Sequence, residues 1–146
     1  MKETKRILLV DDDADDQEFF IEAISRIENA TLFEVANNGK EALQKLEDTN
    51  HLPDIIFLDI NMPVMNGIEC LHAIINNPLT KNIPVVILSS ATPQKDLARK
   101  IGAKAFIKKS ADGKTLRREV GLMIDLDFIL NFEIANQTFK NGRAVS

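Results

Sequence analysis

Residues 7 to 20 read ILLVDDDADDQEFF, and the fold follows from this stretch. The four apolar residues 7 to 10 suit a short buried strand. Five carboxylates then occupy residues 11 to 16, and Phe19 and Phe20 begin a helical apolar pattern that reaches Ile27. A helix N-terminus attracts negative charge, and a bound divalent cation would neutralise more of it. The stretch therefore predicts a strand followed by a helix, with carboxylates gathered at the junction.

The same pattern of a short apolar run followed by a helical segment repeats along the chain. The other apolar runs are LFEV at 32 to 35, IIFL at 55 to 58, VVIL at 85 to 88 and AFI at 105 to 107. The helical patterns contain Ala42 to Leu46, Ile68 to Ile75, Thr92-Pro93 to about Ile101, and Lys114 to Met123. Five β-α units predict an α/β fold, with a parallel sheet covered by helices on both faces. LFEV is the most polar run and suits an edge strand.

Composition limits the classes of protein to consider. The chain has 146 residues, of which 45% are hydrophobic and 27% charged, as expected for one globular domain. Its net charge of -4 and the lack of a basic stripe argue against nucleic-acid binding. No apolar run approaches bilayer length and the N-terminus does not resemble a signal peptide, so we expect a cytoplasmic protein without membrane insertion. Cys70 is the only cysteine and is expected to be buried on a helix.

Polar residues follow four of the five predicted strands. These residues are Asp11 and Asp12, Asp59, Ser89 and, one residue after its strand, Lys109. If the strand order is 2-1-3-4-5, the carboxyl ends of the first and third strands are neighbours, so Asp11, Asp12 and Asp59 converge. Ser89 and Lys109 then lie on the other side of Asp59.

This constellation suits phosphoryl chemistry. Three carboxylates with room for water favour Mg²⁺ over a closed calcium cage. A lysine and a hydroxyl supply donors for an anion that also contacts the metal. Asp59 lies between the two sets and is placed to act as a nucleophile that accepts a phosphoryl group as an acyl phosphate.

Asp11-Asp12, the run LDINMPVMNG at 58 to 67, Ser89 and Lys109 together resemble the receiver domain of bacterial two-component response regulators. The resemblance covers about residues 5 to 124. It implies a flavodoxin-like (βα)5 sheet of order 2-1-3-4-5, a receiver domain at 1–124 and a C-terminal extension at 125–146 without a separate output domain. It also implies a phosphoacceptor that is not itself an enzyme.

The resemblance assigns roles to the acidic residues. Asp59 becomes the phosphoacceptor, Asp12 binds Mg²⁺ directly, Asp11 assists through water, and the backbone carbonyl of Asn61 is a further metal ligand. The remaining acids of the opening stretch, at positions 13, 15 and 16, are then interpreted as cap and first-turn residues of the first helix.

The resemblance also assigns the other polar positions. Lys109 neutralises charge on the transferring group, and the hydroxyl of Ser89 turns toward the phosphoryl group. Phe106 takes the aromatic switch position, although plain core packing explains it equally well. The family usually has Lys-Pro where this chain has Lys109-Ser110, so this loop is either trans and rearranged or locally strained. Lys108 is the alternative lysine, but the spacing from Phe106 favours Lys109.

A calcium loop fits part of the acidic stretch. Positions 1, 3, 5 and 12 of an EF-hand would be Asp11, Asp13, Asp15 and Glu22. Position 6 is Asp16 rather than glycine, and the preceding segment resembles a strand, so we reject this function.

Two further alternatives concern the nucleophile. A haloacid dehalogenase phosphatase needs a second Asp two residues after the first, where this chain has Asn61. A receiver-like docking module that acts without phosphorylation stays open because of the Lys109-Ser110 departure.

The expected partners follow from the receiver interpretation. The phosphoryl donor is a sensor histidine kinase or a histidine phosphotransfer protein, and the output is contact with an unknown downstream protein. The apolar C-terminal extension is expected to pack on its own domain or on a second copy of the chain, which leaves homodimerisation open.

Overall fold

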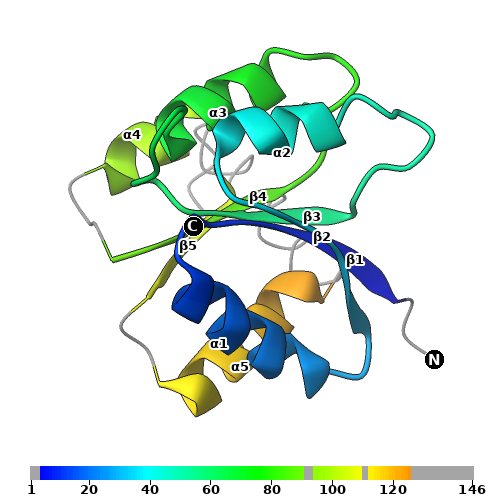
Figure 1. Ribbon diagram of the computed structural model, residues 1–146, viewed down its shortest axis with the longest axis vertical. Helices are drawn as coiled ribbons and strands as arrows, with labels where there is room; N and C mark the ends of the chain where they lie inside the picture. Colours follow the sequence, from blue (N-terminus) through cyan, green and yellow to red (C-terminus); the bar gives the residue numbers. More distant parts are fainter. Residues whose placement is uncertain (1–3, 91–93, 110–111, 126–146) are drawn as a thin grey trace, which may run out of the picture.

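The computed structural model describes residues 4–90, 94–109 and 112–125, where strands and helices alternate along the chain (Figure 1). The strands are β1 (Lys5–Val10), β2 (Ala30–Ala36), β3 (Ile55–Leu58), β4 (Val85–Ser89) and β5 (Ala105–Lys108). The helices are α1 (Ala14–Ser25), α2 (Gly39–Lys45), α3 (Gly67–Ile75), α4 (Lys95–Ile101) and α5 (Gly113–Ile124).

The five strands form one parallel sheet of order β2-β1-β3-β4-β5. This confirms the predicted flavodoxin-like α/β fold and places β2 at an edge, where the more polar run LFEV was expected. Because β1 and β3 are neighbours, their carboxyl ends meet at the centre of one edge of the sheet. That edge is called the carboxyl edge below.

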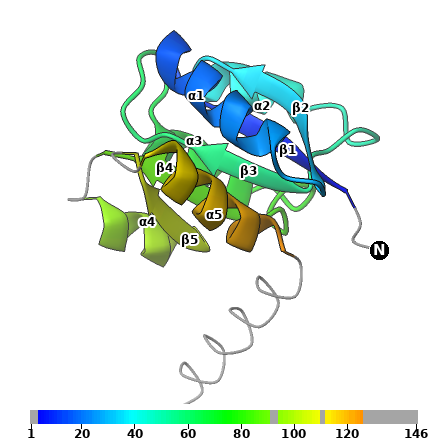
Figure 2. The ribbon, with the colours of Figure 1, turned by 90° about the horizontal axis from the view of Figure 1, so that it is seen from below.

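Helices cover both faces of the sheet. Figure 1 shows α2, α3 and α4 on one face and α1 and α5 on the other, and Figure 2 shows α1 and α5 side by side. Alternate residues of β1 supply the two cores: Ile7 and Leu9 pack under α1 and α5, while Leu8 and Val10 pack under the other helices. Residues 7–10 of this strand are all apolar because both faces of the strand are buried there.

Local capping explains where most helices begin. Asp13 caps α1 as predicted, and Asn66 with Glu69 forms a capping box on α3. The predicted start of α4 at Thr92-Pro93 falls on residues outside the described part. As described, α4 runs from Lys95 with Gln94 in the N-cap position.

Several other expectations have a clear structural outcome. Cys70 is fully buried on α3, where burial raises the pKa of its thiol to about 12. No helix within residues 4–90, 94–109 and 112–125 has the length and apolar character needed to cross a membrane. The C-terminal extension after Asp125 and residue Ser110 lie outside the described residues.

Candidate functional site

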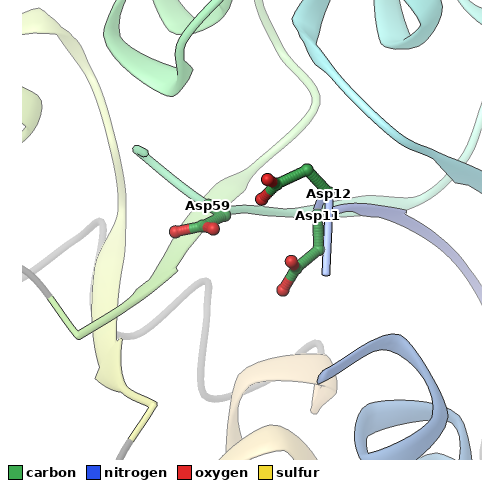
Figure 3. A group of neighbouring side chains, drawn as sticks. All are labelled: Asp11, Asp12 and Asp59. Carbon is green, nitrogen blue, oxygen red and sulfur yellow. The ribbon is translucent and has the colours of Figure 1, made fainter. Parts of the chain in front are cut away.

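Three carboxylates meet at the carboxyl edge (Figure 3). Asp11 and Asp12 follow β1 and Asp59 follows β3, and their ligand atoms lie within 4.8 Å of one another. Asp11 and Asp59 are 1% and 5% exposed, whereas Asp12 is exposed. The Asp59 N–H donates to the Val10 carbonyl at 2.9 Å, which extends the β1–β3 pairing to the site. The structure thus brings together the carboxylates that the sequence placed at neighbouring strand ends.

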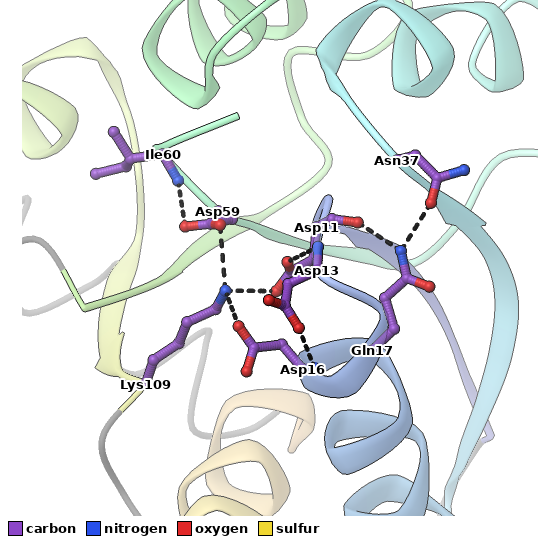
Figure 4. Close-up of polar contacts among 8 residues, drawn as sticks. All are labelled: Asp11, Asp13, Asp16, Gln17, Asn37, Asp59, Ile60 and Lys109. Atoms are coloured by element: carbon purple, nitrogen blue, oxygen red, sulfur yellow. Dashed lines mark hydrogen bonds and ion pairs between the residues drawn. The ribbon is translucent and has the colours of Figure 1, made fainter. Parts of the chain in front are cut away.

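Lys109 enters this cluster from the end of β5 (Figure 4). Its Nζ lies 2.7 Å from Asp11 Oδ2, 2.7 Å from Asp16 Oδ2 and 3.1 Å from Asp59 Oδ2. The side chain is only 15% exposed, whereas Lys108 points to solvent as an exposed residue. Lys109, rather than Lys108, is therefore the lysine at the site.

Asp16 is a site residue that the sequence did not reveal. It was interpreted only as a first-turn residue of α1, and that interpretation was incomplete because its carboxylate accepts a hydrogen bond from Lys109 at 2.7 Å. Its backbone N–H donates to Asp13 Oδ1 at 2.9 Å, as a capped helix start requires. The two residues that pair are 93 positions apart, so spacing within the acidic stretch carried no signal for the contact.

Gln17 fixes the backbone beside the acidic cluster. Its Nε2 donates to the Asp11 carbonyl at 2.6 Å and to Asn37 Oδ1 at 2.8 Å. The Asp13 N–H also donates to Asp11 Oδ1 at 3.0 Å. These bonds connect the β1–α1 loop to the end of β2 and hold the Asp11 carboxylate in place.

The loop after Asp59 depends on a close backbone approach at Gly67. The Asp59 carboxylate accepts the N–H of Ile60 at 2.8 Å, and the Gly67 N–H donates to the Ile60 carbonyl at 2.8 Å. A Cβ at Gly67 would lie 2.1 Å from the Asp59 carbonyl oxygen, so only glycine fits here. Val64 in the same loop is exposed and has a positive φ of 68°, which is unfavourable for a β-branched residue. The exposed Asn61 lies in this loop between Asp59 and Val64, and its carbonyl remains a predicted ligand.

Ser89 and Phe106 lie on the two strands beyond β3. Ser89 is buried at the end of β4 in register with Lys108, and its carbonyl accepts the Lys109 N–H at 3.2 Å. Phe106 is half-buried on β5 against the core, with Lys95 Nζ 5.6 Å from the centre of its ring. It lines a groove of about 250 Å³ beside α4 and β5. The switch roles of Ser89 and Phe106 remain predictions.

The site carries more negative charge than its lysine neutralises. Burial raises the pKa of Asp11 above its ordinary value, and the charge of Asp59 adds to this, while the Lys109 ammonium opposes it. Burial alone would lower the pKa of Lys109, but Asp11, Asp16 and Asp59 outweigh it and the pKa is raised. The lysine is therefore held as a cation among carboxylates.

The carboxylate cluster fits a divalent cation. Asp11 Oδ2 is buried and lies 2.7 Å from Lys109 Nζ, an ammonium that it shares with Asp16 and Asp59. Buried carboxylates that share a single ammonium are unfavourable unless a further cation or donor offsets their charge. Three oxygen donors from Asp11, Asp12 and Asp59 suit a hard ion such as Mg²⁺.

A family model for the response regulator receiver domain matches residues 7–121. The chain belongs to the response regulator receiver family. Among solved structures, this receiver resembles the phosphorylated cyanobacterial phytochrome response regulator RcpA, with 32% identity and a TM-score of 0.71. That likeness covers 81% of this chain and 89% of RcpA. The CheY of the CheX-CheY-BeF3-Mg²⁺ complex from Borrelia burgdorferi gives 31% identity and a TM-score of 0.70, covering 83% and 90% of the two chains.

A curated relative contains a segment similar to this receiver within a longer chain. The protein-glutamate methylesterase/protein-glutamine glutaminase of Bacillus subtilis is 36% identical over 115 residues. The match covers 76% of this receiver but 31% of the methylesterase. The receiver thus spans about a third of the length of this relative.

Proposed function

We propose that this receiver accepts a phosphoryl group on Asp59 from the phosphohistidine of a sensor histidine kinase or histidine phosphotransfer protein. One observation carries the proposal: the nearly buried Asp59 has Lys109 Nζ at 3.1 Å and shares one cluster with the carboxylates of Asp11 and Asp12. A lone strand-end aspartate would need neither partner.

The proposed step is an in-line displacement at phosphorus. An oxygen of the Asp59 carboxylate forms a bond to phosphorus, while the bond from phosphorus to the partner's histidine nitrogen breaks and that nitrogen keeps the electron pair. The Asp59 oxygens start as hydrogen-bond acceptors of Ile60 N–H and Lys109 Nζ, so the carboxylate is oriented before the reaction. Lys109 stabilises negative charge on the transferring oxygens.

A bound Mg²⁺ belongs to the proposal. Asp11, Asp12 and Asp59 would hold it, with the Asn61 carbonyl as the further ligand implied by the family resemblance. Its contribution is electrostatic, because a divalent cation offsets charge that one lysine cannot. Asp11 has a further role in this chain, since its fixed carboxylate keeps the lysine close to Asp59.

The proposed output is contact with a downstream protein. We place the chain in the cytoplasm, where phosphohistidine donors of two-component systems act, and assign it no nucleic-acid partner because its net charge is -4. The proposed role is that of a phosphoacceptor, and the esterase activity in the name of the Bacillus relative is not assigned to this chain.

Intact-protein mass after incubation with acetyl phosphate and Mg²⁺ tests the proposal. We expect one base-labile phosphoryl adduct, which is absent without Mg²⁺ and absent in Asp59→Asn. The adduct should have the same mass whether acetyl phosphate or a phosphorylated histidine donor is used. No adduct, under conditions that modify a known receiver, would instead support a docking module that acts without phosphorylation.

A further inference from the structure

The contact between Asp16 and Lys109 has a role that the metal cluster does not explain. Lys109 Nζ has carboxylate neighbours at Asp11, Asp16 and Asp59, so three acids share one ammonium. Asp11 and Asp59 also belong to the group of carboxylates that could hold a metal, and Asp16 does not. Asp16 is thus the lysine partner that is spared from metal binding.

The three contacts respond differently when the site is loaded. At equal distance a divalent cation attracts a carboxylate twice as strongly as an ammonium does, so it competes with Lys109 for Asp11 and Asp59. A phosphoryl group on Asp59 then removes a charged oxygen of that side chain. Asp16 keeps its full charge throughout, on a helix start fixed by its own N–H bond to Asp13 at 2.9 Å.

We propose that Asp16 is a positioning residue that holds the Lys109 ammonium beside Asp59 once metal and phosphoryl group occupy the other carboxylates. This inference rests on the proposed phosphoryl transfer. Figure 4 shows Lys109 Nζ bonded to both Asp16 and Asp59, at 2.7 and 3.1 Å. The ammonium therefore already lies where it can meet a group on Asp59 while it stays bound to Asp16.

Loss of the Asp16–Lys109 contact should have a moderate effect, because one of the two side chains is well exposed to water. The Lys109 side chain is 15% exposed, whereas that of Asp16 is 46% exposed. Water screens the acidic end, which weakens the pair relative to a fully buried one. Loss of Asp16 should leave Lys109 mobile in the loaded site rather than remove it.

Asp16→Asn tests the proposal, with Asp15→Asn as the matched control. Asp15 is exposed on the same helical turn, so its variant loses the same charge one residue away from the contact. In saturating Mg²⁺, we expect Asp16→Asn to lower the maximal rate of adduct formation from acetyl phosphate about three- to tenfold. The Mg²⁺ concentration for half-maximal rate should stay unchanged, and Asp15→Asn should react like the native chain.

A second readout does not depend on phosphorylation. Relaxation of the 13C-labelled Lys109 Cε, assigned with Lys109→Arg, reports side-chain order in the Mg²⁺-saturated protein. We expect high order in the native chain and in Asp15→Asn, and low order in Asp16→Asn.

The outcomes separate the two proposals. Equal Lys109 order in the native chain and Asp16→Asn would overturn the positioning role, and so would equal rates or an equal loss in Asp15→Asn. If the native chain forms no adduct, the proposed function fails, and the relaxation comparison alone then decides for or against Asp16.

Discussion

Charged side chains are arranged differently at the two ends of the parallel strands, here called the amino edge and the carboxyl edge. At the amino edge Arg6, the second residue of β1, pairs with Asp54, with Arg6 Nε 3.6 Å from Asp54 Oδ2 and side chains 43% and 38% exposed. The same carboxylate accepts the Arg6 N–H at 2.8 Å, and the Arg6 guanidinium donates to the Leu52 carbonyl. At the carboxyl edge, one ammonium is shared among several acids, two of which are buried.

The charges at the amino edge stabilise the fold slightly, whereas the excess of negative charge at the carboxyl edge destabilises it. The Arg6–Asp54 pair is balanced and hydrated, so removing it should change little. Asp11 and Asp59 are desolvated, and both share the single Lys109 ammonium with Asp16. A fold gains nothing by burying acids in excess, so such an arrangement indicates a site that a cation and an anion complete.

Among the substitutions that test this difference between the two edges, Gly67→Ala should have the largest effect on stability. The new Cβ would lie 2.1 Å from the Asp59 carbonyl oxygen and 2.7 Å from Ile60 Cα, so the end of β3 or the start of α3 must move. We expect a loss of roughly 2–3 kcal/mol in the free energy of unfolding. Adduct formation at Asp59 should fall as well. Urea unfolding and the mass assay measure the two effects.

Gly121→Ala is the matched control for this variant. Gly121 lies within α5, and a Cβ there would meet nothing within 4 Å. Alanine should therefore stabilise the helix by about 0.5–1 kcal/mol. If Gly67→Ala behaves like Gly121→Ala, the close approach is not what holds the carboxyl edge.

The sequence predicted what depends on strand ends and missed what depends on loops. Asp11, Asp12 and Asp59 could be predicted because each follows a run of four apolar residues and the strand order brings those ends together. The β-α alternation also predicted the fold, because strand segments that are buried on both faces appear in the sequence as uninterrupted apolar runs.

The missed features are one contact between side chains far apart in the chain and two backbone features of the segment between β3 and α3. The Asp16–Lys109 bond needs a chosen rotamer of a first-turn residue, which an acid at a helix start does not specify. The close approach at Gly67 and the positive φ of Val64 are set by how α3 packs on the end of β3. Local pattern carries no information about either.

Asp11→Asn should change the free energy of unfolding by an intermediate amount, and the sign of this change depends on whether Mg²⁺ is bound. The folded protein raises the pKa of Asp11, chiefly by burial, so ionised Asp11 destabilises the fold as pH rises above the ordinary Asp range. A neutral amide removes that cost, while Lys109 keeps Asp16 and Asp59. Without Mg²⁺ at pH 7 we expect a gain on the order of 1 kcal/mol in the free energy of unfolding.

Urea unfolding at two pH values and with Mg²⁺ checks this result. The gain in stability of the variant should vanish below the ordinary Asp pKa of 3.8. At that pH the Asp11 carboxyl of the native chain is neutral in the folded and unfolded states, as the amide of the variant always is. Saturating Mg²⁺ should stabilise the native chain and have a much smaller effect on the variant, since a ligand that binds only the folded state stabilises it. A variant that is less stable without Mg²⁺, with an unchanged Mg²⁺ response, would make Asp11 a structural residue.

Asp54→Asn should have the smallest effect and so tests the other half of the comparison. Asparagine still offers an oxygen to the Arg6 N–H, and only the hydrated charge attraction is lost. We expect a loss of about 0.5 kcal/mol, reduced further by salt because both side chains are well exposed. Urea unfolding at low and high NaCl measures this, with Mg²⁺ stabilisation unchanged from the native chain. A loss as large as that of Gly67→Ala, or a change in the Mg²⁺ response, would mean that the two edges are coupled through β1 and do not divide fold from function.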